Sequence, residues 1–249
     1  MYSVKVAALG CFGLVSGLAM AEKIPSVVPS PVEQAFIPLG FDDNDNVEVV
    51  LHGHFSNSCY KTGDVKVTVD EATKSITLSP TALHYKDGYC LQMQIPFLQS
   101  VRLGVVKEGE YKVVVENQPN AKTERLSIKR TESSNPDDYL YAPISSVAIR
   151  KETVAENNTT RSIMTLKGEY PYMFNGCMEI QRVRKYMSPG NVMVVLPIAE
   201  VVQGETCLLR GGDQKFERQV VVDEKLEGDI LLHVRTLNGE SLNHLEENY

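Results

Sequence analysis

The chain has 249 residues, a formal net charge of -7 and 43% hydrophobic residues, as expected of a globular protein with one or two domains. This composition excludes disorder throughout the chain. Its acidic character also argues against binding to nucleic acid or to an anionic membrane surface, because both repel a negatively charged protein at long range. We therefore expect a folded protein with no nucleic acid among its partners.

The first 21 residues, MYSVKVAALGCFGLVSGLAMA, predict a signal peptide. Lys5 lies near the start, an apolar stretch follows, and small residues stand at Ala19 and Ala21. The apolar stretch is interrupted by glycines and is shorter than the roughly 20 residues that span a bilayer. We expect cleavage after Ala21, no transmembrane segment in the mature chain, and a periplasmic or secreted location. Lipid attachment at Cys11 is a less favoured alternative, because few apolar residues precede it.

Residues 22–35 are expected to form an extended lead-in. This segment contains EKIPSVVPSP, whose prolines favour extended or disordered backbone. The first domain is expected to begin near Phe36.

The segment Asp42–Asn46, DDNDN, clusters the oxygen ligands that calcium prefers. It departs from the EF-hand loop, because the sixth position is Val47 rather than glycine and the twelfth is Gly53 rather than glutamate. A charged loop between strands is the favoured interpretation, and a calcium site of another kind stays an open alternative.

A short pattern occurs twice along the chain. Residues 51–55 read LHGHF and residues 166–170 read LKGEY, and a cysteine follows each segment. When the two glycines are aligned, apolar residues coincide at alternate positions of both copies, as on the inward face of a strand. The intervening positions differ between the copies. They include His52 and His54 in the first copy, and we expect them to lie on a solvated outer face.

The mature chain is expected to have an even set of cysteines, Cys59, Cys90, Cys177 and Cys207. Four cysteines permit three pairings. The repeat selects one of them, because Cys59 aligns with Cys177 and Cys90 aligns with Cys207. We therefore predict the bridges Cys59–Cys90 and Cys177–Cys207, one in each copy, as suits an exported protein in an oxidising compartment.

Between these anchors the sequence predicts short strands separated by turns, with no sustained helical period. The expected strands are residues 47–55, 65–69, 75–78, 91–95, 101–105, 111–116 and 125–129 in the first copy, and 161–170, 178–184, 192–196, 216–222 and 229–235 in the second. Several strands in each unit of about 110 residues are typical of two sheets packed face to face. The fold prediction is all-β, with two tandem β-sandwich domains and one disulfide in each.

The order of these strands resembles that of immunoglobulin-like or fibronectin III-like modules, although the chain has no tryptophan to pack on a bridge between sheets. We place the domains at residues 36–130 and 141–249. The polar, proline-containing segment at residues 131–140 is expected to be the linker between them.

His52 and His54 stand two positions apart on an expected strand, so both rings project from one face. Such a pair can supply two ligands to a metal ion, but zinc requires three or four, and no further histidine is close in sequence except His84. We therefore expect no metal, no cofactor and no catalytic residues. A metal-dependent hydrolase that uses His52 and His54 is the least favoured alternative.

The second copy carries an insertion before Cys177 that is rich in large apolar groups, and a basic cluster follows it. Aromatic side chains, methionine and arginine commonly anchor protein interfaces. The expected binding residues are Tyr172, Met173, Phe174, Arg182, Arg184 and Lys185. The alternative is that the apolar residues of this set cap the core or pack against the first domain.

Together these features predict an exported, non-enzymatic binding or structural protein of the cell envelope, which engages another protein or envelope component. An alternative is an assembly factor that resembles the periplasmic pilus chaperones, which also have two immunoglobulin-like domains and bind clients by adding a strand to a sheet. The acidic charge of this chain departs from that family, whose members tend to be basic.

Overall fold

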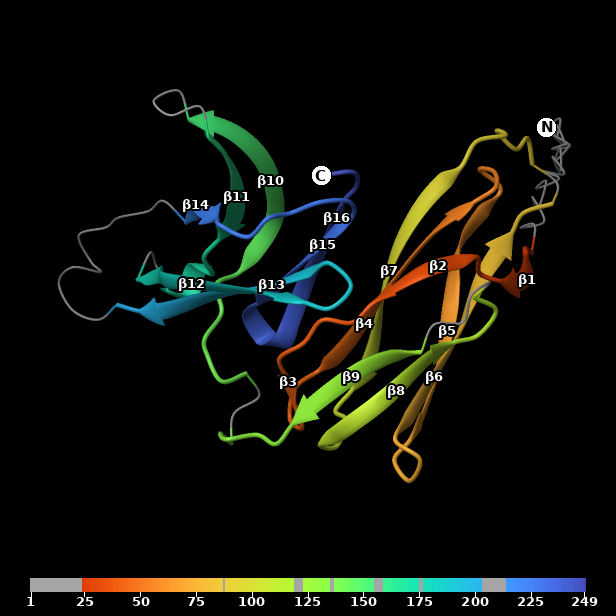
Figure 1. The fold of residues 1–249 in the computed structure, drawn as a ribbon, viewed down its shortest axis with the longest axis horizontal. Helices are drawn as coiled ribbons and strands as arrows, with labels where there is room; N and C mark the ends of the chain where they lie inside the picture. Colours follow the sequence, from red (N-terminus) through yellow and green to blue (C-terminus); the bar gives the residue numbers. More distant parts are fainter. Residues whose placement is uncertain are drawn as a thin grey trace, which may run out of the picture.

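The structure is a computed structural model that describes residues 24–86, 88–118, 123–134, 137–154, 159–174, 177–202 and 214–249. It is an all-β protein whose two halves lie side by side (Figure 1). The predicted signal peptide at residues 1–21 and the cysteines Cys11 and Cys207 lie outside the described residues. Within the described ranges, no helix is long and apolar enough to cross a bilayer.

The strands of the first half are β1 (Ser26–Pro29), β2 (Val32–Phe36), β3 (Phe41–Asp42), β4 (Val47–Phe55), β5 (Tyr60–Asp70), β6 (Ser75–His84), β7 (Ile95–Gly104), β8 (Gly109–Val115) and β9 (Glu124–Lys129). The strands of the second half are β10 (Ile144–Val154), β11 (Thr159–Glu169), β12 (Met178–Ser188), β13 (Val192–Val201), β14 (Lys215–Val222), β15 (Ile230–Thr236) and β16 (Glu240–Glu246). Two short 3-10 helices, η1 (Tyr172–Phe174) and η2 (Leu237–Gly239), belong to the second half.

The first half is built from two sheets that face one another. One has the order β1-β6-β8-β9-β3, with β5 also paired to β6, and the other has the order β2-β4-β7. Alternate side chains of both sheets fill the space between them, and Leu51 of β4, Leu78 of β6 and Tyr111 of β8 are fully buried there. This half is a β-sandwich, as predicted.

The second half has a corresponding arrangement of strands. Its sheets have the orders β12-β13-β15-β16 and β10-β11-β14, which match β5-β6-β8-β9 and β2-β4-β7 of the first half. In the larger sheet of each half, the two central strands of the matching four run parallel. These pairs are β6 with β8 and β13 with β15. A second apolar core lies between these two sheets, around Met164, Leu166 and Met193.

Most of the expected strands are present, and β4 has the expected bounds. The expected strand at residues 91–95 is wrong, because only Ile95 belongs to β7. The sequence also does not predict β10 or β16, since both carry many polar side chains. Each of them is held by backbone pairing, β10 to β11 and β16 to β15, which local apolar alternation does not reveal.

Of the expected lead-in at residues 22–35, the structure describes residues 24–35, which are extended and largely belong to the sheets. Strand β1 pairs with β6, and β2 pairs with β4. Val32 is buried in the first core, so the folded chain begins before the expected boundary at Phe36. Pro29 and Pro31 are tolerated because they lie where β1 ends and just before β2 begins.

The glycine of the LHGHF segment lies where two other parts of the first half approach the backbone closely. A Cβ atom at Gly53 would overlap the carbonyl oxygen of Pro31 and would lie 2.9 Å from Cζ of Phe97. The ring of Phe97 in turn stacks on the ring of Phe55, with centroids 4.6 Å apart. Any side chain at this position would push the strands apart.

The glycine of the LKGEY segment has the same surroundings in the second half. A Cβ atom at Gly168 would overlap the carbonyl oxygen of Pro143 and would lie 2.5 Å from Cζ of Phe216. The ring of Phe216 stacks on the ring of Tyr170, with centroids 4.4 Å apart. The repeated pattern therefore reflects one packing arrangement, a glycine covered by a proline carbonyl and an aromatic pair, that occurs once in each half.

A third apolar cluster joins the two halves. Phe36 and Val50, from β2 and β4, pack against Val192, Val194 and Leu231, from β13 and β15, and all five are buried. The outward face of sheet β2-β4-β7 therefore covers the outward face of sheet β12-β13-β15-β16. The four sheets form a stack whose two inner layers have no solvated face over this contact.

The expectation of a solvated outer face on β4 is consequently wrong. Strand β4 is buried along almost its whole length, and His52 has an exposed fraction of 5%. Alternating apolar residues along β4 identify the face of the strand that packs on the core of the first half. They do not tell whether a neighbouring sheet covers the other face.

Polar contacts complete this junction. The guanidinium of Arg235, on β15, reaches into the first half, where it lies 3.4 Å from Oδ2 of Asp45 and donates to the carbonyl oxygen of Gly40 at 3.2 Å. It also lies over the ring of Phe41, 4.1 Å from the centroid. Nη1 of Arg235 also lies 3.9 Å from Oδ1 of Asp137, so two carboxylates balance this buried charge, and loss of Arg235 would leave the buried Asp45 without its cation.

His233, two positions earlier on β15, is fully buried beside the same contact. Its Nδ1 lies 2.8 Å from Oδ1 of Asn243, and the side-chain amide of Asn243 donates to Glu48 of the first half. Burial, reinforced by the nearby positive charge of Arg235, lowers the pKa of His233 to about 3. Burial also raises the pKa of the Glu48 carboxyl.

Replacing Gly168 by alanine is expected to lower the free energy of unfolding by about 1–3 kcal/mol, because the added methyl group forces backbone and ring apart. Urea denaturation followed by circular dichroism measures this loss. Gly88→Ala is the matched control, since its Cβ would lie 3.5 Å from Sγ of Cys59, an ordinary contact. Equal losses in the two variants would show that the close approach at Gly168 is not the cause.

The junction is expected to weaken in mild acid through His233. The unfolded chain takes up a proton there at about pH 6.5, whereas the folded chain does so only at about pH 3. Below about pH 6.5 the unfolded chain therefore binds a proton that the folded chain does not, and the free energy of unfolding falls. At pH 5 the loss from this one histidine is about 2 kcal/mol. In urea unfolding the wild-type protein should show this additional loss relative to His233→Gln, in which Glu48 still titrates. Parallel losses in both proteins would contradict the assignment.

Candidate functional site

The aromatic members of the predicted binding residues, Tyr172 and Phe174, lie in η1, in the connection between β11 and β12. Tyr172 has an exposed fraction of 82%, whereas Phe174 is partly buried and packs against the second core. A hydrogen bond from the amide of Phe174 to the carbonyl of Pro171, 2.9 Å long, helps to fix the turn. The capping alternative therefore applies to Phe174, while Tyr172 is left exposed. The side chain of Met173 lies outside the described residues.

The predicted basic cluster is divided by the strand that carries it. Arg182 and Arg184 are exposed on one face of β12, with their guanidinium carbons 5.9 and 5.2 Å from the ring centroid of Tyr139. Arg184 also donates to the Tyr139 hydroxyl at 3.0 Å. Lys185 is the next residue and points the other way, toward Glu224, to which it is paired at 2.8 Å. The structure thus adds Tyr139 to the group and removes Lys185 from it.

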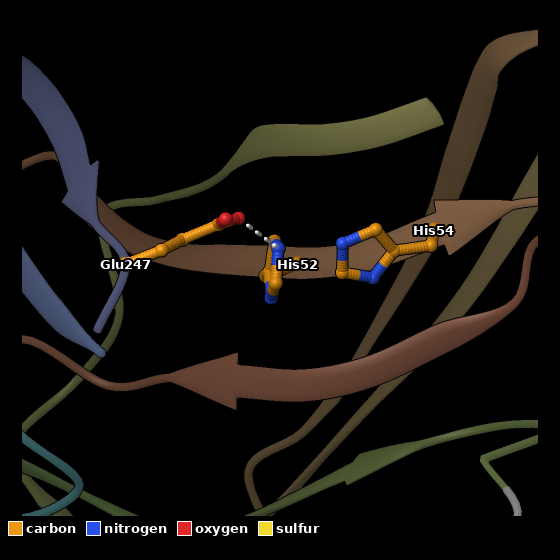
Figure 2. A group of neighbouring side chains, drawn as sticks. All are labelled: His52, His54 and Glu247. Carbon is orange, nitrogen blue, oxygen red and sulfur yellow. Dashed lines mark ion pairs between the residues drawn. The ribbon is translucent and has the colours of Figure 1, made fainter. Parts of the chain in front are cut away.

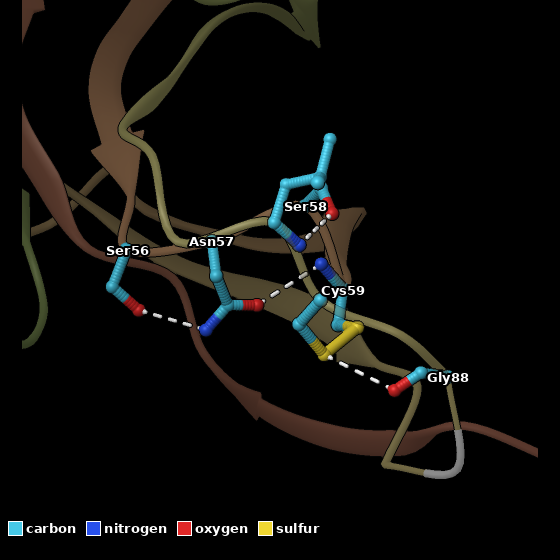
Figure 3. Close-up of a disulfide and its surroundings, with 7 residues drawn as sticks. Ser56, Asn57, Ser58, Cys59 and Gly88 are labelled. Carbon is cyan, nitrogen blue, oxygen red and sulfur yellow. Dashed lines mark hydrogen bonds between the residues drawn. A yellow bond between two sulfur atoms is a disulfide. The ribbon is translucent and has the colours of Figure 1, made fainter.

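The predicted bridge Cys59–Cys90 is confirmed, with Cα atoms 5.2 Å apart. Figure 3 shows the hydrogen bonds around it. The amide of Cys59 donates to Oδ1 of Asn57 at 3.0 Å, and the amide of Leu91 donates to Oγ of Ser58 at 2.9 Å. The bridge and these bonds join the β4–β5 connection to the β6–β7 connection.

Of the second predicted bridge, the structure describes Cys177 but not Cys207. Cys177 is disulfide-bonded. Its expected partner, Cys207, lies outside the residues that the structure describes, so the pairing Cys177–Cys207 stays a prediction.

Exposed apolar side chains flank and follow the first disulfide. Tyr89 is fully exposed, and Leu91 and Met93 have exposed fractions of 67% and 52%. They occupy alternate positions of the β6–β7 connection, which includes most of the strand expected at residues 91–95. Their alternation therefore marks an exposed apolar surface rather than the half-buried strand that such a pattern usually indicates.

The acidic loop at Asp42–Asn46 uses its oxygen atoms in contacts within the protein. Oδ1 of Asp43 accepts a hydrogen bond from the amide of Thr131 at 2.8 Å. Asp45 is buried and paired with Arg235. These contacts give the loop a structural role, because they attach the first half to the linker and to β15.

His52, His54 and Glu247 form a group within the described ranges that could hold a metal ion. The two rings project from the same face of β4, with centroids 5.1 Å apart, and Nε2 of His52 lies 3.6 Å from Oε1 of Glu247 (Figure 2). One potential ligand atom of each residue lies within 4.8 Å of those of the other two. Glu247 is not recognisable from the sequence as a third ligand, because it follows β16 and is far from both histidines along the chain.

The surroundings of this group are partly polar and partly apolar. Nδ1 of His54 lies 3.1 Å from Oε2 of Glu33, on β2. A pocket of about 300 Å³ adjoins His52 and Glu247, and apolar side chains that include Leu98 line its walls. Burial lowers the pKa of His52, and positive charge on His54 acts in the same direction.

The turn at η1 gives a test of which residue is available for binding. Phe174→Ala is expected to lower the free energy of unfolding by about 2 kcal/mol, because it removes a ring packed on the second core. Tyr172→Ala is expected to change it by less than about 0.5 kcal/mol, because the ring is exposed. Thermal and urea unfolding of both variants measure the difference. A loss in Tyr172→Ala as large as that in Phe174→Ala would mean that Tyr172 is a core residue.

Comparison with protein families adds one finding. Residues 49–126 match the family model described as the ORF11 beta-sandwich domain. No curated protein and no solved structure matches the chain. Over part of its first half the chain is therefore similar to this family, in agreement with the two facing sheets described above.

Proposed function

We propose that this protein is an exported, non-enzymatic binding protein of the cell envelope, which engages another protein through its second half. The exposed ring of Tyr172 is the observation that carries the proposal. Its turn is held by Phe174, which packs on the core beneath. Little conformational freedom is therefore lost when a partner covers the tyrosine, and this is the property of an aromatic interface anchor.

The ring of Tyr139, with Arg182 and Arg184 around it, is a second part of the proposed surface. The two guanidinium groups present positive charge on a protein whose net charge is -7. Planar guanidinium groups bind carboxylates through paired hydrogen bonds. We therefore infer a partner with an acidic surface. Lys185 is not part of this surface, because Glu224 neutralises it.

The architecture that we propose is a tandem pair of immunoglobulin-like domains, with one disulfide in each. The corresponding strand orders and the matching surroundings of Gly53 and Gly168 support this proposal. The bridge Cys59–Cys90 supports an oxidising location, because disulfides persist mainly outside the cytosol. A signal peptide cleaved after Ala21 would bring the chain to the periplasm or to the outside of the cell.

The proposed surface is tested by cross-linking in cells, followed by mass spectrometry of the proteins captured by the full chain. Tyr172→Ala combined with Arg184→Ala is expected to lower capture of the partner at least about tenfold, the effect of losing one good interface anchor. Tyr89→Ala is the matched control, since it removes an exposed tyrosine from the first half and should leave capture unchanged. Undiminished capture by the double variant would refute the surface, and loss in the control alone would move it to the first half.

A chaperone-like assembly factor is a second candidate, favoured by the edges of sheet β10-β11-β14. Among the described strands, β10 and β14 each pair with β11 alone. Such edges can accept a strand from another protein. In that case a proline at an outward-facing amide of β10 would abolish capture of the client, whereas removal of the Tyr172 ring would not.

A further inference from the structure

Side chains from three separate segments meet at the junction of the two halves. His52 and His54 come from β4, Glu33 comes from β2, and Glu247 follows β16 of the second half. We propose that His52, His54 and Glu247 bind a zinc ion, which ties the first half to the second.

The separations between the candidate ligand atoms are close to those of a zinc site. Bonds of about 2.0–2.2 Å from zinc to nitrogen and oxygen place tetrahedral ligand atoms about 3.3–3.6 Å apart. Nε2 of His52 and Oε1 of Glu247 are already 3.6 Å apart, and the set as a whole lies within 4.8 Å. Small side-chain rotations, without movement of β4, would close the remaining distance.

An unsatisfied polar atom gives an independent reason to expect a ligand. Nε2 of His52 is buried and has no hydrogen-bond partner among the described residues. Buried polar side-chain atoms are hydrogen-bonded or metal-bound in the large majority of cases, because an unpaired one costs about 1–3 kcal/mol. This nitrogen faces the carboxylate of Glu247 (Figure 2). A zinc ion between the two would satisfy both.

Glu33 orients the second histidine. Its carboxylate lies 3.1 Å from Nδ1 of His54, so it accepts a hydrogen bond from the N–H of that nitrogen and favours the tautomer in which Nε2 has a free lone pair. Figure 2 shows the other ring nitrogen of His54 directed toward His52. A carboxylate behind a ligating histidine is the usual outer partner of protein zinc sites, where it fixes the ring and increases its basicity.

The donor types favour zinc over the common hard cations. Calcium and magnesium prefer sets made of oxygen atoms alone, whereas two imidazoles and one carboxylate suit zinc. The three protein ligands leave a fourth position. The pocket beside His52 and Glu247 has room for a water molecule there.

The test uses the mature full chain without a histidine tag, stripped of metal by a chelator. Isothermal titration with zinc chloride and elemental analysis after dialysis should both give one zinc ion per chain. Glu247→Gln and His52→Gln are each expected to weaken zinc binding more than about a hundredfold, because each removes a direct ligand. Glu33→Gln is expected to weaken it less, by about tenfold, as measured for outer partners of zinc ligands. His84→Gln is the matched control, because His84 stacks on Tyr60 away from the junction.

The variants also distinguish a junction site from a site within one half. Glu247 is exposed by nearly half, so Glu247→Gln should fold normally, and circular dichroism of the metal-free protein checks this. Zinc should raise the melting temperature of the wild-type protein and of His84→Gln, but not that of Glu247→Gln. Failure of the wild-type chain to bind zinc at micromolar concentration would overturn the proposal. Unchanged binding by Glu247→Gln would also overturn it, because the ion would then lie elsewhere.

Discussion

Phe36, Val50 and Leu231 are withdrawn from water between the two halves, and Arg235 crosses the same junction to reach Asp45. This contact converts two sandwiches into one stack of four sheets. It is why β4, β13 and β15 are buried on both faces over much of their length. The position of each group at the junction follows from it, including His52 beside Glu247 and the buried His233.

The sequence was sufficient for the features that each half determines by itself. Alternation along β4 located the strand, because one of its faces meets the core of its own half. The repeat predicted the bridge Cys59–Cys90, which the structure confirms. The other face of β4 could not be predicted, since its burial depends on how the halves dock. The approach of Glu247 to His52 is hidden for the same reason, because no local pattern encodes a contact between distant segments.

For the candidate binding residues, the sequence gives the type of side chain but not the direction in which it points. Tyr172 and Phe174 are both aromatic and lie two positions apart, so the sequence does not distinguish them. In the 3-10 turn Tyr172 is exposed, whereas Phe174 packs on the core. Lys185 differs from Arg184 by one position, and strand alternation alone separates their directions. Tyr139 comes from the linker, whose path is set by tertiary contacts, so composition did not single it out.

Because the two halves bury apolar side chains against each other, both halves are needed for the chain to remain monodisperse in solution. A break within residues 131–140 that let the halves separate would bare apolar surface on both, around Val50 on one side and Leu231 on the other. Contiguous apolar patches of that kind drive proteins to self-associate. Each half therefore covers an apolar surface of the other, and either half on its own would tend to self-associate.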